Sequence, residues 1–121
     1  MPADVKHALP SFAWSVDELW KLKLPIEDFP VERFSWLLEL PIWRWRGKRW
    51  QVSMREVLDD PNRYRAHHEK SERTDTRYPI HVSFHNGRWI ILDGYHRLLK
   101  TLSREERTIK AVNVRAQDLH H

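Results

Sequence analysis

Hydrophobic residues recur at helical spacing in three short stretches of the first sixty positions. Ser15 and Glu18 form a capping-box pattern, which satisfies the first backbone N–H groups of a helix, so we predict a helix near 16–23. Apolar residues three and four apart predict a second helical segment over 31–38, which Pro41 would stop. A second S-x-x-E pattern predicts a third short helix over 54–58.

Further along, the pattern changes to the alternation typical of strands. Asn86-Gly87 lies between two β-rich runs and is a strong hairpin signal. A type I′ turn there pairs Phe84 with Trp89 and Val82 with Ile91. Because the second run is apolar on both faces, we expect it inside a sheet and not at an edge.

Two other stretches complete the pattern. Residues 108–114 alternate as a further strand, whereas residues 59–78 are polar and predict a long connection with a helical turn near 62–69. Residues 1–14 show no period and predict a loose arm.

The stretch IWRWRGKRWQV also predicts a hairpin. If Gly47-Lys48 is its turn, Trp45 faces Trp50 and Trp43 faces Val52 on the inward side. The other side then faces either solvent or a ligand, and it carries three arginines: Arg44, Arg46 and Arg49.

The stretch ILDGYHRLLK, residues 91–100, contains the sharpest change of period. A buried strand ends at Asp93, and from Tyr95 the apolar residues follow one helical face. Asp93 or Gly94 is therefore expected at the N-cap. The face predicted to point into the core contains Tyr95, Leu98, Leu99 and Leu102, and the residues expected off that face are His96, Arg97 and Lys100.

This turn combines features that favour an anion. A helix N-terminus offers unpaired N–H groups and a positive dipole end, and Gly94 permits close approach to the backbone. Arg97 supplies a planar fork for phosphate oxygens, and His96 can donate or shuttle a proton. The alternative is that both side chains are merely exposed. Asp93 would repel phosphate, so it is better placed as a cap, a partner of Arg97, or a metal or base group.

The motif Asp93-Gly94-Tyr95-His96-Arg97, preceded by an Asn-Gly hairpin and followed by a strand, resembles the ParB/sulfiredoxin superfamily over roughly residues 41–116. The resemblance implies a small α+β fold that binds nucleotide phosphates or nucleic acid at the helix start. Members include CTP-binding chromosome-partition proteins, ATP-using sulfiredoxins and a ParB-like free-serine kinase. It implies that Gly94, His96 and Arg97 contact phosphate.

Position 95 departs from these relatives. Sulfiredoxins carry their catalytic cysteine there, and this chain has tyrosine at 95 and no cysteine anywhere, which argues against sulfinic acid reduction. The glutamate that partition proteins commonly carry there is also absent. We further expect no helix-turn-helix domain after the last strand, and therefore no partition protein proper.

Composition and charge narrow the classes. The 121 residues suit one domain, and the lack of cysteine excludes disulfides and zinc-thiolate sites. The net charge of +4 is uneven: residues 1–40 carry 4 − 7 = −3 and residues 41–121 carry 17 − 10 = +7. The basic part favours a polyanion or a phosphorylated ligand, or is simply a solvated surface. The seven tryptophans predict an aromatic core, with base stacking as the alternative use.

Other histidines are weaker candidates. His81 and His85 share a strand face at a spacing that could hold metal, but no carboxylate cluster accompanies them. His67-His68 is expected to be solvated, and His120-His121 is typical of the remnant of a purification tag. No Walker pattern or nucleophile elbow is present.

We therefore predict a single α+β domain with a small mixed sheet, in which 1–40 form a peripheral arm with short helices and 41–116 the ParB/sulfiredoxin-like domain. The predicted function is binding of a nucleotide, such as ATP or CTP with Mg²⁺, or of another phosphorylated small molecule, with phosphotransfer or hydrolysis as a further step. The alternatives are a nucleic-acid-binding module and a non-enzymatic interaction domain. We expect a cytoplasmic protein that does not bind membranes. The catalytic candidates are Asp93 and His96, the ligand-binding candidates are Gly94, His96, Arg97 and Lys100, and the secondary basic surface is Arg44, Arg46 and Arg49; no protein-bound metal is expected.

Overall fold

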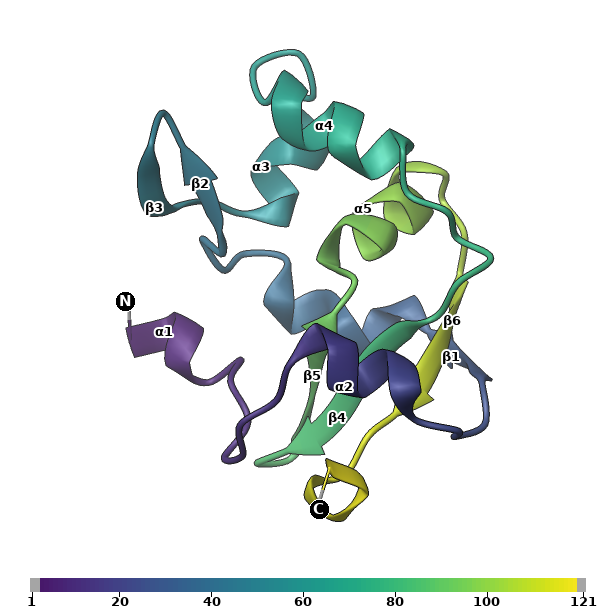
Figure 1. Ribbon diagram of the computed structural model, residues 1–121. Helices are drawn as coiled ribbons and strands as arrows, with labels where there is room; N and C mark the ends of the chain where they lie inside the picture. Colours follow the sequence, from purple (N-terminus) through teal and green to yellow (C-terminus); the bar gives the residue numbers. More distant parts are fainter. Residues whose placement is uncertain (1–2, 120–121) are drawn as a thin grey trace.

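The computed structural model describes residues 3–119, which form a small α+β domain (Figure 1). The helices in this range are α1 (Ala3–Lys6), α2 (Val16–Lys21), α3 (Met54–Asp59), α4 (Arg65–Glu72), α5 (Tyr95–Ser103) and the 3₁₀ helices η1 (Val31–Leu37) and η2 (Ala116–Leu119). The strands are β1 (Glu27–Pro30), β2 (Trp43–Trp45), β3 (Lys48–Val52), β4 (Ile80–His85), β5 (Arg88–Asp93) and β6 (Thr108–Asn113). Within residues 3–119 no helix combines the length and apolar character needed to cross a bilayer.

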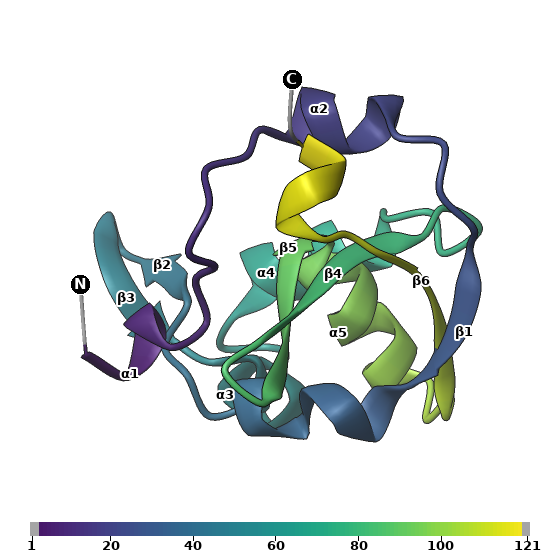
Figure 2. The ribbon, with the colours of Figure 1, turned by 90° about the horizontal axis from the view of Figure 1, so that it is seen from below.

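The main sheet is mixed, with the strand order β1-β6-β4-β5. The pairs at its two ends are antiparallel, and β4 and β6 in the middle are parallel. Helices cover both faces: α5 and η1 lie against one, and α2 and η2 against the other (Figure 2). Successive side chains of β5 point to opposite faces of the sheet and so contribute to both core clusters. Ile91 packs on the side of α5, whereas Ile90 and Leu92 pack on the side of α2.

The expected Asn86-Gly87 hairpin is confirmed. Phe84 pairs with Trp89 and Val82 pairs with Ile91, as the turn type requires. Both turn residues have positive φ, 50° and 78°, the conformation of a type I′ turn. Ser15 and Ser53 are confirmed as N-caps, because each accepts a hydrogen bond from the backbone N–H three residues later, and at Ser53 the side chain of Glu56 completes the capping box.

The expected interior position of β5 is wrong, because β5 is an edge strand of the sheet. Its apolar character on both faces comes from the helices above and below it, not from a second neighbouring strand. Two indoles donate to its backbone: Trp14 Nε1 to the carbonyl of Leu92 at 3.2 Å and Trp36 Nε1 to the carbonyl of Trp89 at 2.9 Å. These bonds satisfy carbonyls that an edge strand would otherwise expose.

The peripheral position expected for residues 1–40 is wrong for their second half. β1 forms the other edge of the sheet, where Phe29 pairs with Ile109. Phe34 and Leu37 of η1 are fully buried in the main core. The N-terminal third therefore belongs to the same packing unit as the rest of the chain.

The turn of the β2–β3 hairpin also differs from expectation. Trp45 pairs with Lys48, so the turn is Arg46-Gly47, with φ of 51° and 80°. Trp43 still pairs with Val52, so β3 has two more residues than β2 between the two pairs, and the irregularity includes Trp50, whose φ is 59°. Trp50 thus does not face Trp45.

The polar connection 59–78 contains a complete helix, α4, which extends beyond the expected turn. It packs against α5, which is why a stretch with few aliphatic residues holds a fixed place. Its buried contacts come from Tyr64 and Ser71.

Candidate functional site

The first turn of α5 lies directly after β5, as the change of period predicted. Gly94 is the N-cap with φ +112°, and no side chain caps the helix in the described part of the chain. The first turn also contains no acidic residue. The N–H of Leu98 is the first of the helix to donate to the carbonyl of Gly94, at 3.0 Å, so among residues 3–119 the earlier amides of the turn have no acceptor within the helix and remain available as donors.

Glycine at position 94 is required by the protein itself. A Cβ there would collide with the Cγ2 of Ile80 and lie 2.8 Å from its Cβ, and φ +112° strains any other residue. The glycine therefore lets β4 and the turn pack closely, and close approach of a ligand is not needed to explain it.

On one side of the turn, Asp93 lies among the side chains of Arg97, His81 and Trp20. Arg97 Nη1 is 3.6 Å from Asp93 Oδ2, and Nδ1 of the neighbouring His81 on β4 is 3.8 Å from the same oxygen. Trp20 of α2 lies over this cluster, with its ring 4.9 Å from His81 and 5.4 Å from the Cζ of Arg97. An N-terminal helix thus contributes to the site.

These neighbours lower the pKa of Asp93, with His81 as the largest cause and the charge of Arg97 as a smaller one, while burial acts in the opposite direction. Asp93 is therefore a carboxylate near neutral pH. The cluster nevertheless contains buried side-chain nitrogens without a hydrogen-bond partner. His81, only 3% exposed, has no hydrogen-bond partner for Nδ1 within residues 3–119, and the same is true of the buried Nε of Arg97.

On the other side of the turn, His96 stacks on Trp43 of β2 at 4.4 Å between ring centroids. His67 of α4 stacks on the same indole at 4.8 Å. The two histidines meet edge to edge, with His67 Nδ1 3.4 Å from His96 Nε2, and His67 Nε2 lies 2.7 Å from the carbonyl oxygen of Arg44.

Burial lowers the pKa of His96 to about 4, and the charges of Lys70 and His67 act in the same direction. His96 is therefore a neutral imidazole near neutral pH, able to donate from one ring nitrogen and accept at the other. It does not add a positive charge to the turn.

The outward position expected for Lys100 is wrong. The residue is only 9% exposed, and its Nζ donates to the carbonyls of Glu72 at 3.0 Å and Thr74 at 2.7 Å. The ammonium thus caps the C-terminal end of α4, where carbonyls are unpaired and the helix dipole favours a cation. By contrast, Leu98 and Leu99 are buried and Tyr95 packs against the core, as predicted.

The remaining sequence candidates lie elsewhere. Arg44, Arg46 and Arg49 are exposed on the β2–β3 hairpin. His81 is buried beside Asp93, whereas His85 is near the far end of β4, next to Asn86. Within the described range no group of three or more histidine, cysteine or acidic side chains could hold a metal ion. His120-His121 lies outside the described residues.

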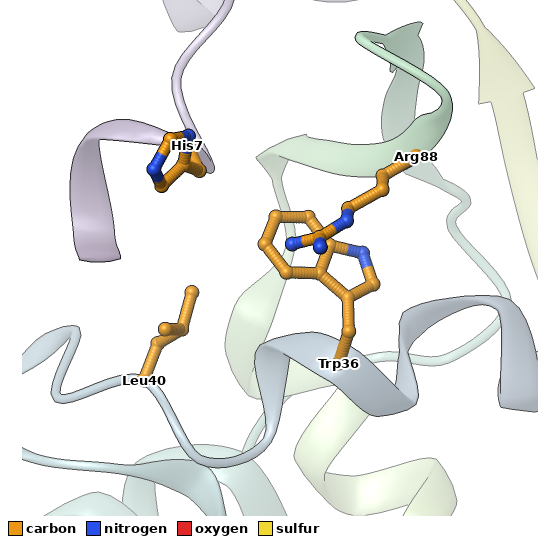
Figure 3. Close-up of a pocket in the computed structure, with 4 residues that line it drawn as sticks. All are labelled: His7, Trp36, Leu40 and Arg88. Atoms are coloured by element: carbon orange, nitrogen blue, oxygen red, sulfur yellow. The ribbon is translucent and has the colours of Figure 1, made fainter.

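A separate hollow opens at the opposite end of β5 from Asp93. His7, Trp36, Leu40 and Arg88 line a cavity of about 360 Å³. Figure 3 shows the guanidinium of Arg88 over the indole of Trp36, and the Cζ lies 4.8 Å from the ring. The guanidinium of Arg88 therefore covers one face of the Trp36 indole. The hollow shares no lining residue with the 93–97 turn.

Sequence reasoning missed His67, His81, Trp20 and Trp43 as parts of the site. His81 pairs with Asp93 only because the register of the hairpin shifts by one residue between His81 and Val82; the register set by the Asn86-Gly87 turn would place Leu92 opposite His81. His67 lies in a polar stretch with no pattern that points to α5. Comparison with protein-family models, curated proteins and solved structures found no match to the chain.

Proposed function

We propose that the protein binds a nucleotide or another phosphorylated small molecule at the strand-turn-helix 93–97. Phosphate oxygens would accept hydrogen bonds from the free amides in the first turn of α5, and Arg97 would add a charged donor. Phosphotransfer or hydrolysis is the chemistry that such a site would serve, with Asp93 and His96 as the groups able to accept or move a proton.

One observation carries the proposal: buried side-chain nitrogens without hydrogen-bond partners lie beside a helix start that no side chain caps. His81 Nδ1 and Arg97 Nε have no hydrogen-bond partner in the described chain, and both belong to side chains that face Asp93. Leaving a buried donor unpaired costs about 1–3 kcal/mol. A ligand that brings acceptor oxygens to this end of α5 would remove part of that cost and would also occupy the positive end of the helix dipole.

The carboxylate of Asp93 is the main obstacle to an anion. The guanidinium of Arg97 and the imidazole of His81 approach it at 3.6 and 3.8 Å, longer than a hydrogen bond, so Arg97 compensates its charge without closing the cluster by a short contact. Arg97 can therefore turn toward a phosphate while its guanidinium stays within reach of Asp93. A magnesium ion that accompanies a nucleotide would meet in Asp93 the oxygen ligand that it prefers.

His96 would contribute hydrogen bonds and not charge, because its ring is neutral near neutral pH. Binding should therefore not weaken as pH rises from about 6 to 8, in contrast to a site that depends on an imidazolium.

We also propose that the fold is of the ParB/sulfiredoxin type. The support is the D-G-x-H-R motif between a strand and a helix, followed by a strand, here β5, α5 and β6. The chemistry of sulfiredoxins is not part of the proposal, because the chain contains no cysteine.

A thermal-unfolding screen tests the proposal. The protein would be heated with ATP, CTP, GTP or pyrophosphate, each with and without Mg²⁺. A ligand present at about 100 times its Kd should stabilise the protein by about 2.7 kcal/mol. The stabilisation should disappear in Arg97→Ala, measured against that variant's own unliganded baseline.

Arg104→Ala is the matched control, because it removes the same charge from the other end of α5. It should keep the full stabilisation. The proposal fails if none of these compounds stabilises the protein, or if Arg97→Ala retains the effect. Absence of any binding would favour the interaction-domain alternative.

A further inference from the structure

The outer face of the β2–β3 hairpin forms a second candidate site, away from α5. Ile42, Arg44, Arg49 and Trp50 line a shallow hollow of about 210 Å³. Trp50 reaches this hollow because the irregularity in β3 gives it a φ of 59° and takes it out of register with Trp45. A bulge of this kind re-aims a side chain.

The hairpin is also strongly basic. Its exposed cations are Arg44, Arg46, Lys48 and Arg49, and no acidic residue occurs between Glu39 and Glu56. Arg55, the next cation, pairs with Glu39 at 3.1 Å, whereas the four hairpin cations form no ion pair within the described residues. Together these four side chains carry a charge of +4, which is as large as the net charge of the whole chain.

The two faces of the hairpin have different tasks. Trp43 points inward and stacks on His96 and His67, so it is part of the α5 site. The adjacent Arg44 is exposed and lines the outer hollow with Trp50. A ligand in this hollow would therefore not compete with one at the first turn of α5.

We infer that this outer face binds single-stranded nucleic acid, with one base stacked on Trp50 and the adjoining phosphates on Arg44 and Arg49. Flat aromatic groups alternate with anions along a single strand, and this hollow is lined by one indole and two arginine side chains. A duplex would satisfy the cations but would keep its base faces hidden from Trp50. An acidic peptide would supply charge without a ring for the indole.

The test is fluorescence anisotropy with a labelled single-stranded oligonucleotide of about 12 nucleotides. Trp50→Ala should weaken binding by about tenfold, the loss of one stacked base. Trp50→Phe should keep most of the affinity. Trp50→Leu keeps an apolar side chain without a ring and should bind as weakly as the alanine variant, so a loss of apolar contact is distinguished from a loss of stacking.

The contribution of the arginine charges is measured separately, from the salt dependence of the affinity. Removing both Arg44 and Arg49 should reduce the slope of log affinity against log salt by about 1.4, the value for two phosphates on a single strand. The matched controls are Arg104→Ala with Arg107→Ala, which removes two exposed charges elsewhere, and Phe84→Ala, which removes an exposed ring from β4.

Arg97→Ala should bind the oligonucleotide like the wild type, so this inference and the nucleotide proposal can fail separately. The inference is overturned if the oligonucleotide does not bind, or if binding is unchanged by both Trp50→Ala and Trp50→Leu. In the second case the hairpin would act only as a cationic surface. A duplex that binds as tightly as the single strand would overturn it as well.

Discussion

His67 and His96 come from different helices and meet on one indole, with His67 Nδ1 3.4 Å from His96 Nε2. The carbonyl of Arg44 can only accept, so the proton of His67 must sit on Nε2, 2.7 Å away. In a neutral His67, Nδ1 is then an acceptor, and His96 donates to it from Nε2. This leaves the lone pair of His96 on Nδ1, which suits a general base better than a phosphate-binding cation.

The first prediction follows from the low pKa of His96, about 4. Between that value and the ordinary 6.5, the unfolded chain binds a proton that the folded protein does not, so His96 stabilises the fold above about pH 6.5 and this contribution is lost as pH falls toward 4. We expect a loss of about 1–2 kcal/mol in the free energy of unfolding between about pH 7.5 and pH 5, reduced from the full linkage because solvent screens the ring partly. Urea unfolding at both pH values measures it.

His96→Phe is the control, because it keeps a ring on Trp43 and removes the titrating group. Its free energy of unfolding should depend less on pH over the same interval. An equally steep dependence in this variant would assign the effect to other groups.

The second prediction concerns Gly94. Gly94→Ala should destabilise the protein by roughly 2–4 kcal/mol, because it combines an unfavourable φ with a collision against Ile80. Gly87→Ala, at φ +78° with open space around it, should cost only about 1 kcal/mol. Adding Ile80→Ala to Gly94→Ala should cost less than Ile80→Ala costs alone in the wild type. Strict additivity would show that the two residues do not collide.

The third prediction separates Lys100 from ligand binding. Lys100→Met should lower the free energy of unfolding by about 1–3 kcal/mol, because the carbonyls of Glu72 and Thr74 lose their donor. Nucleotide affinity should stay the same. Lys110→Met, at an exposed position of β6, should be nearly neutral for stability. A Lys100→Met variant with native stability and weakened nucleotide binding would restore the sequence-based interpretation of this residue.

The sequence predicted those structural features that are determined by a few neighbouring residues, and it missed those that depend on tertiary contacts. The Asn86-Gly87 turn sets its own register, so the pairs across β4 and β5 followed from a few residues. β1 was missed because Glu27 and Asp28 are exposed, Pro25 precedes the strand and Pro30 ends it; the strand forms because β6 offers a partner. The turn at Arg46-Gly47 was missed because a positive φ at arginine and tryptophan leaves no mark in the pattern.

The site shows the same limit. The helix start after Asp93 and the inward face of α5 were predictable from the period alone. Lys100 was not, because a helical pattern cannot show that the end of α4 lies within reach of its ammonium. His67 and Trp20 reach the turn through tertiary packing, which brings α4 and α2 to opposite sides of it.

The fourth prediction concerns the indoles on β5. Trp36→Phe and Trp14→Phe each keep an aromatic ring but leave an edge carbonyl without its donor, so each should lower the free energy of unfolding by about 0.5–1.5 kcal/mol. Trp45→Phe is the comparison, because its indole nitrogen makes no hydrogen bond within residues 3–119. An equal loss in all three variants would assign the effect to ring size.

The route of the N-terminal third has a consequence for how the protein can be divided. Residues 27–30 close one edge of the sheet, and Trp14 and Trp36 close the other. A fragment that begins at Pro41, where the superfamily resemblance starts, would keep the 93–97 motif. It would expose both edges of the remaining three-stranded sheet. Unpaired edge strands are templates for pairing between molecules. Such a fragment would therefore precipitate or form β-rich aggregates instead of serving as a minimal binding domain.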